Sequence, residues 1–258
     1  DYEKAVSWLY AADRLYQLPL GVVGIAVGIV LLPDLSRRLK AGDDSGARSA
    51  YSRASEVSLA LTIPSAIALI VIPLPLISVL FERGNFTADD TASTALAVAI
   101  YGLGLPAFVM QKTLQPLFFA REDTKSPFRY ALVAMLVKMV LAFGLKQWMG
   151  WLARAVGASA AAWIMVAQLS FGARKFGTVT KLDARFKARI WRIILAAVLM
   201  GALLFWVNLA LSPMFTAGAQ RYLALLLLVI TGIISYFGLG QLVGAFHLSE
   251  FKAAARRE

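Results

Sequence analysis

Four ionisable side chains lie inside long apolar stretches of this sequence, where a charge would be costly if the stretch crossed a membrane. Asp13 and Arg14 stand together in the first such stretch, and Lys112 and Lys138 lie within two later ones. An arginine guanidinium can bind a phosphate through two parallel hydrogen bonds, and a lysine offers a compact positive charge. These residues are therefore candidates for binding an anionic ligand.

Asp13 and Arg14 cannot pair with each other, because adjacent residues on a helix point in different directions. Each is expected to find a partner on another helix or in a ligand. Two interpretations stay open at this point. The pair caps a helix at the membrane surface, or it lines a cavity.

Lys138 is the deepest of the four charges. It lies eleven residues beyond Pro127, which places it about 16 Å into a helix that starts there. No acidic residue occurs within 127–145, so the ammonium is expected to face a cavity or to pair across helices. Snorkelling to the membrane surface is the alternative, and for Lys112 the two interpretations are evenly balanced.

The amino-acid composition indicates the class of protein to which these charged residues belong. Hydrophobic residues make up 59% of the 258 residues and charged residues only 16%, against about a quarter in soluble domains. Apolar stretches alternate with short basic clusters, and no strand-like alternation is present. Because lipid leaves backbone groups no partner except within helices or closed barrels, we predict an all-α, polytopic membrane helix bundle.

Seven transmembrane helices are predicted from runs of roughly 20 mainly apolar residues. The predicted spans are residues 8–33, 57–81, 90–118, 127–145, 151–172, 190–211 and 221–246.

Several boundaries of these spans have local signals. Thr87 and Asp90 fit a capping box that opens the third span, and Ser126 fits an N-cap before Pro127. Asp43 and Asp44 are predicted to start a short amphipathic helix within 40–55. Prolines within or beside the second and third spans predict kinks there.

The distribution of basic residues predicts an orientation. Eighteen of the 26 lysines and arginines fall in alternate connections and the C-terminal tail, which the positive-inside rule places in the cytoplasm. The N-terminus of the chain is then periplasmic. Basic loops that meet anionic membrane lipids account for the net charge of +11 without nucleic acid.

Catalytic and metal chemistry have little support in this sequence. There is no cysteine, no phosphate-binding glycine loop and no zinc-type spacing, and the single histidine, His247, cannot serve a catalytic triad plausibly. We therefore expect no enzyme activity, no metal and no cofactor. Since the first residue is not Met and no signal peptide follows, we also expect the chain to begin inside a longer protein.

Three segments carry a family resemblance. Residues 31–37 with Gly42 and Asp43 resemble an LLPxLSR…GD stretch, 79–87 a VLFxxGxFT loop, and 112–127 a KxLxPxFYAxxDTxTP segment. All three belong to the MurJ (MviN) family of lipid II flippases and occur here in the family's order. The resemblance extends over roughly residues 8–180.

This resemblance implies a fourteen-helix protein of the MOP exporter superfamily, with two six-helix lobes around a cavity and two additional C-terminal helices. The chain would supply helices eight to fourteen. Residues 1–180 would form most of the second lobe with five transmembrane helices, and 181–258 the two additional helices with a basic cytoplasmic tail. The missing N-terminal lobe would be a partner within the same protein.

The resemblance also implies roles for the charged residues. Tyr10 to Arg14 matches the family's (Y/A)-A-D-R segment, so Arg14 would face the cavity and help hold the substrate's pyrophosphate, with Asp13 supporting or gating it. Some members bind sodium through Asn and Asp on the eleventh helix, but 127–145 contains neither. The ammonium of Lys138 is expected to place a positive charge in a position comparable to that of the sodium ion.

The implied function is transport of lipid-linked peptidoglycan precursor from the cytoplasmic to the outer leaflet of the bacterial inner membrane, by alternating access and without ATP. Two alternatives remain. One is a cation-coupled exporter of drugs or of another polyprenyl-linked saccharide, although the spans offer only Asp13 as an acidic coupling group. The other is a membrane scaffold that transports nothing.

Overall fold

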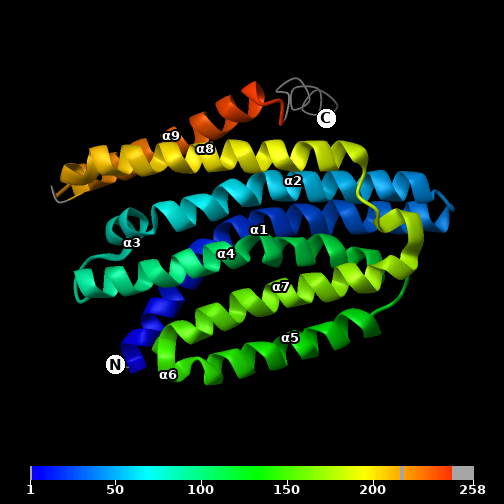
Figure 1. The fold of residues 1–258 in the computed structure, drawn as a ribbon, viewed down its shortest axis with the longest axis horizontal. Helices are drawn as coiled ribbons and strands as arrows, with labels where there is room; N and C mark the ends of the chain where they lie inside the picture. Colours follow the sequence, from blue (N-terminus) through cyan, green and yellow to red (C-terminus); the bar gives the residue numbers. More distant parts are fainter. Residues whose placement is uncertain (1, 216–217, 246–258) are drawn as a thin grey trace.

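The computed structural model of the chain describes residues 2–215 and 218–245, nearly all of them helical (Figure 1). In chain order the elements are α1 (Tyr2–Lys40), α2 (Asp44–Val71), α3 (Pro73–Phe81), α4 (Ala88–Phe119), α5 (Lys125–Gly144), α6 (Lys146–Met149), the 3₁₀ turn η1 (Gly150–Leu152), α7 (Ala153–Ala173), the 3₁₀ segment η2 (Arg174–Thr180), α8 (Ala184–Phe215) and α9 (Gln220–Leu242). The prediction of an all-α membrane bundle is confirmed.

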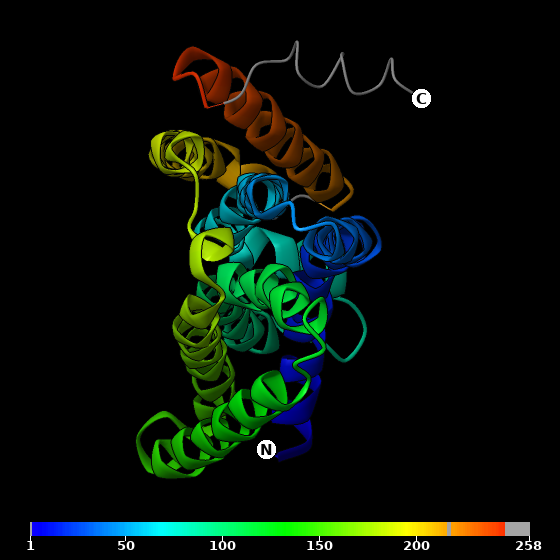
Figure 2. The ribbon, with the colours of Figure 1, turned by 90° about the vertical axis from the view of Figure 1, so that its right-hand side faces the viewer.

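The long helices lie side by side, with α8 and α9 along one edge and α5 along the other (Figures 1 and 2). The central helix is α4, which packs against α1, α2 and α7. Its side chains Val98, Leu105 and Val109 are completely buried. In contrast, α5, α8 and α9 expose many large apolar side chains, as expected of helices that border lipid.

Six helices in the described ranges are long and apolar enough to cross a membrane: α2, α4, α5, the α6–η2 stretch, α8 and α9. They match six of the predicted spans. The predicted span 8–33 lies within α1, which is a continuous helix of 39 residues but is not among the six. The count of seven therefore stays a prediction.

The second predicted span, 57–81, is two helices rather than one kinked helix. The break falls at Ile72, where α2 ends and Pro73 opens α3. Proline has no backbone N–H and its ring clashes with the preceding turn, so it is favoured at the start of a helix and costs free energy within it. Lipid-embedded helices can nevertheless contain proline, and α4 continues through Pro106 and Pro116.

Helix starts agree with the sequence at two positions and differ at one. The Thr87–Asp90 capping box is confirmed: Asp90 Oδ2 accepts from the Thr87 N–H at 2.8 Å. The helix start predicted at Asp43 and Asp44 is also confirmed, because Asp43 caps α2, but this helix runs on to Val71 and is not a separate short helix within 40–55. The predicted Ser126 N-cap is wrong. Asp123, a stronger acceptor, takes the Ser126 N–H at 3.0 Å, and α5 begins at Lys125.

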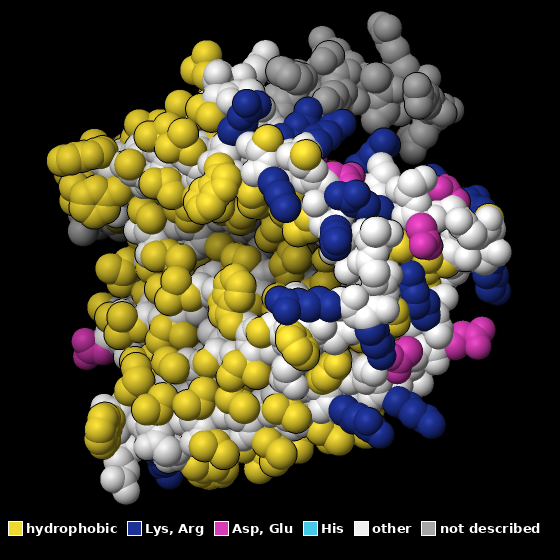
Figure 3. All heavy atoms as spheres, turned by 45° about the vertical axis from the view of Figure 1, so that its right-hand side comes forward, with side chains coloured by type: hydrophobic (Ala, Val, Ile, Leu, Met, Phe, Trp, Pro, Cys, Tyr) yellow, Lys and Arg dark blue, Asp and Glu magenta, His cyan; other side chains and the backbone are white. Residues whose placement is uncertain are grey.

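Basic side chains gather at one end of the bundle, while apolar side chains cover most of the rest of the face in view (Figure 3). This end carries the α1–α2 and α4–α5 connections together with η2 and the start of α8. Hairpin connectivity thus brings the predicted cytoplasmic loops together. His247 and the basic C-terminal tail lie outside the described residues.

The two last helices dock on α2 through a polar junction. Arg189 of α8 and Glu56 of α2 form an ion pair of 2.7 Å in which each side chain is 13% exposed. Tyr236 of α9 donates to the Ala60 carbonyl at 2.5 Å. These contacts explain how residues after 180 attach to the rest. The division into units 1–180 and 181–258 stays a prediction.

Gly157 permits the close approach of α7 to α5. A Cβ at this position would lie 2.9 Å from the Lys138 carbonyl oxygen, a backbone atom that cannot move aside cheaply. We expect Gly157→Ala to destabilise the protein by about 1–3 kcal/mol, the usual cost of overpacking. Thermal unfolding in detergent measures this. The control is Gly238→Ala in α9, where nothing lies within 4 Å, and equal melting temperatures for both variants would contradict the packing.

Asp123 stabilises the α4–α5 connection through its charge. The Lys175 ammonium at 2.7 Å, followed by the Ser126 hydroxyl and N–H, lowers the pKa of Asp123 to about 2. This stabilisation is present above the ordinary carboxyl pKa near 4 and is lost as the pH falls toward 2. Asp123→Asn should therefore cost on the order of 1 kcal/mol at neutral pH, since Lys175 is half exposed and screened.

The difference in unfolding free energy between wild type and Asp123→Asn should shrink between about pH 4 and pH 2. Glu122→Gln, the neighbouring carboxylate, is the control and is expected to have little effect. A difference for Asp123→Asn that does not depend on pH would show that the charge is not what stabilises the connection.

Candidate functional site

The segment around Arg14 lies well inside helix α1 rather than at its end. Arg14 follows the start of α1 by twelve residues, about 18 Å of helix. Tyr16 stacks against Tyr101 and Phe108 of α4, with ring centroids 4.8 Å and 5.3 Å apart. Because Tyr101 lies about 20 Å along α4 from Ala88, this contact is deep in the bundle.

One face of α1 is buried against α4, and Arg14 lies on the other. Ala11 and Ala12 are buried, and Trp8 donates from Nε1 to the Asp90 carboxylate at 2.9 Å. The Arg14 side chain is exposed. The rotation of α1 that these contacts fix therefore directs the guanidinium away from α4.

Each of the two central charges has a partner one turn away on its own helix. Arg14 donates to the Tyr10 hydroxyl, and its guanidinium carbon lies 4.7 Å from the centre of the Tyr10 ring. Asp13 accepts from the Gln17 amide. The expectation that both find partners across helices or in a ligand is thus corrected, since residues four apart share a helix face.

Arg14 belongs to an exposed stripe on α1. The stripe repeats every four residues and consists of Val6, Tyr10, Arg14, Leu18 and Val22. Arg14 forms no ion pair with any acidic side chain in the described ranges, so most of its donors remain available. A guanidinium in apolar surroundings with free donors is suited to binding a phosphate group.

Lys112 and Lys138 are not brought together with Arg14 in one cluster. Lys112 is exposed on α4, where its Cγ would lie 3.9 Å from a Cβ added to Gly24 of α1. Lys138 is exposed on α5, the edge helix, and no acidic side chain of the described chain pairs with it. A role for either lysine in a cavity stays a prediction.

Sequence reasoning missed two features of α1 and its surroundings. Tyr10 is the hydrogen-bond partner of Arg14, and Gln17 is the partner of Asp13. In both pairs the residues are four apart, a spacing that could have predicted these hydrogen bonds. The second feature is a cleft of about 520 Å³ between α1 and α2. It depends on how two helices pack, for which the sequence gives no direct signal. In the described residues, no group of three or more His, Asp or Glu side chains could hold a metal ion.

The fold and the placement of Arg14 define a class: a polytopic α-helical membrane protein with a guanidinium on the exposed face of one long helix. Comparison with known proteins is more specific. The family model described as lipid II flippase MurJ matches residues 2–229, and the chain belongs to this family.

Individual relatives agree with this assignment. Two proteins named "Probable lipid II flippase MurJ" match 99% of the chain, one from Rhizobium tropici at 37% identity and one from Rhizobium meliloti (strain 1021) at 39%. A solved structure, "Lipid II flippase MurJ, inward closed conformation", covers 92% of the chain and 47% of its own length with a TM-score of 0.75 at 25% identity. The chain spans about half the length of the curated relatives it matches, 48% of each Rhizobium protein.

Proposed function

We propose that this chain is the second half of a transporter that moves lipid II, the lipid-linked peptidoglycan precursor, from the cytoplasmic to the outer leaflet. The observation that carries the proposal is the family match over residues 2–229. The protein acts by alternating access in the bacterial inner membrane, with the basic end of the bundle in the cytoplasm. It is a transporter and not an enzyme.

Arg14 binds the pyrophosphate of the cargo in this proposal. Its support is geometric: Arg14 lies about 18 Å along α1 from Tyr2, on the exposed face of the helix, and its guanidinium donates back to Tyr10. Tyr10 holds the guanidinium in place through a hydrogen bond. An anion then meets a positioned partner.

Asp13 has a supporting role. Gln17, one turn away, fixes the carboxylate of Asp13, which is adjacent to Arg14 and offsets part of its charge when the site is empty. Lys112 and Lys138 add positive charge on α4 and α5, which lowers the cost of bringing a dianion into the bundle. The N-terminal lobe supplies the facing wall of the cavity.

The membrane potential can drive such a step without ATP. One elementary charge moving through 100 mV is worth roughly 2.3 kcal/mol, so a dianionic pyrophosphate that moves outward gains roughly 4–5 kcal/mol. The transporter has only to shield the charge during passage. An exposed arginine on helix α1 is consistent with that task.

Substitution of Arg14 in the full-length protein tests the proposal. In proteoliposomes with lipid II, Arg14→Ala should lower the flipping rate at least tenfold, because a charge-assisted contact to the pyrophosphate is lost. Arg14→Lys should retain part of the rate, since it keeps the charge without the bidentate fork. Arg129→Ala is the matched control, an exposed arginine of α5 at the basic end.

The same assay separates transport from a scaffold role. If Arg14→Ala and the double variant Arg14→Leu/Lys138→Leu flip lipid II at the rate of Arg129→Ala, the cargo role of α1 is wrong. Melting temperatures of all variants are measured in parallel, so that a loss of folding is recognised as such.

A further inference from the structure

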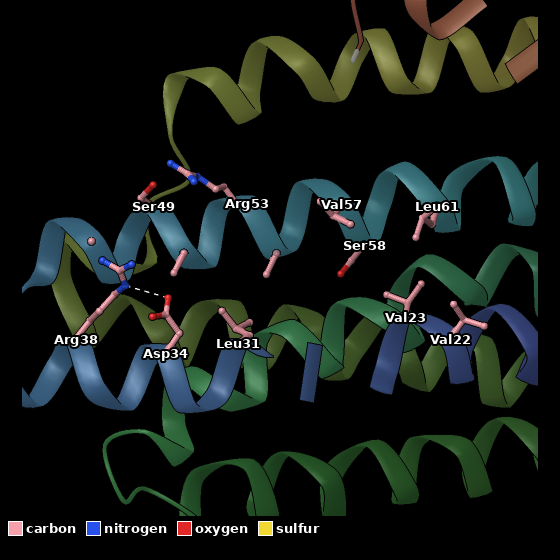
Figure 4. A pocket seen from close by; sticks show the side chains of 13 residues that line it. Val22, Val23, Leu31, Asp34, Arg38, Ser49, Arg53, Val57, Ser58 and Leu61 are labelled. Atoms are coloured by element: carbon pink, nitrogen blue, oxygen red, sulfur yellow. Dashed lines mark hydrogen bonds and ion pairs between the residues drawn. The ribbon is translucent and has the colours of Figure 1, made fainter. Parts of the chain in front are cut away.

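The cleft between α1 and α2 has an apolar body and a polar end. Val22 and Leu31 of α1 and Val57 and Leu61 of α2 line the body, and Asp34, Arg38, Ser49 and Arg53 lie toward the end that carries the basic loops (Figure 4). Its volume of about 520 Å³ is within the range of small-molecule sites. The cleft is therefore complementary to an amphipathic ligand, which has an apolar chain and a polar head.

The arginines at the polar end differ in whether they have an ion-pair partner. Arg38 forms ion pairs with Asp34 at 2.9 Å and with Asp43 at 3.2 Å. Asp34 also pairs with Arg37 at 2.8 Å. Arg53 is exposed and has no ion pair or hydrogen bond to any described residue. The cluster therefore keeps one positive charge in excess, and that charge is on a guanidinium with all its donors free.

Ser58 supplies an independent sign of a ligand. The side chain is 1% exposed and lines the cleft, pointing from α2 toward α1, and its hydroxyl has no hydrogen-bond partner (Figure 4). A helical hydroxyl usually donates to the carbonyl one turn earlier, as Thr62 does to Ser58 at 2.6 Å. A buried hydroxyl left without a partner costs free energy unless a ligand accepts from it.

The spacing of these groups along α2 matches the layers of one membrane leaflet. From Ser49 to Leu61 the helix rises about 18 Å, close to half of a bilayer core plus its interface. Ser58 lies five residues deeper than Arg53, about 7.5 Å. A ligand along this cleft has an anionic group at the surface, a hydrogen-bond acceptor just beneath it and an apolar chain below.

We propose that the α1–α2 cleft binds an anionic glycerophospholipid. Its phosphate pairs with Arg53, an ester carbonyl accepts from the Ser58 hydroxyl, and one acyl chain lies along Val57 and Leu61. A polyprenyl pyrophosphate does not fit this pattern, because its chain is joined directly to the phosphate and offers no ester carbonyl to Ser58. The site is therefore separate from the cargo site around Arg14.

Lipid binding to the purified full-length protein in detergent tests this, with native mass spectrometry to count bound lipids. Phosphatidylglycerol should bind at least fivefold more tightly than phosphatidylcholine with the same chains, because only the former has a net negative charge. Arg53→Gln should abolish that preference, whereas Arg129→Gln, an exposed arginine outside the cleft, should keep it.

An ether-linked phosphatidylglycerol, which has no ester carbonyl, tests the Ser58 contact. Ser58→Ala should weaken binding of the ester lipid about three- to tenfold and leave the ether lipid unchanged. Ser235→Ala in α9, whose hydroxyl already donates to Gly232, is the control. The proposal would be overturned by equal affinities for all lipids, by an Arg53→Gln variant that keeps the preference, or by the absence of bound lipid. None of these outcomes depends on flipping activity.

Discussion

The aromatic contact of Tyr16 with Tyr101 and Phe108 fixes the rotation of α1 on α4, and the rest of the account depends on that rotation. Aromatic pairs add specific geometry to the area they bury. With this face of α1 held against α4, residues four apart beginning at Val6 form the exposed stripe, and Arg14 is directed away from the packed core. Only a rotation of α1 by two or three residues would turn residue 14 to the side on which Ala11 and Ala12 are buried.

Helix α1 links the two sites that we propose. The exposed stripe that contains Arg14 ends at Val22, and Val22 also lines the α1–α2 cleft. Arg14 lies toward the end of the bundle opposite to the basic loops, whereas Arg53 lies at that basic end. One helix therefore carries the proposed anion site and contributes the wall of the proposed lipid site at the basic end of the bundle.

Much of this architecture follows from the sequence, and the exceptions have physical causes. Apolar length located six spans, and the Thr87 capping box appeared as predicted because a cap depends only on neighbouring residues. The break at Ile72 was missed because Pro73 opens a new helix, the helix that Asp43 starts is longer than predicted, and Asp123 replaced Ser126 as the acceptor at the start of α5. The partners of Asp13 and Arg14 were readable from spacing, but the cleft and the unpartnered Ser58 arise from tertiary packing.

Residue 14 is proposed to face an aqueous, anion-accepting space, and this can be tested by the accessibility of a cysteine at that position. This chain has no cysteine, so Arg14→Cys can be labelled in the membrane with a water-soluble maleimide, in a full-length background free of other cysteines. Rapid labelling is expected at residue 14, and no labelling is expected of Trp206→Cys on the exposed apolar face of α8. Residue 14 as unreactive as residue 206 would contradict the proposal.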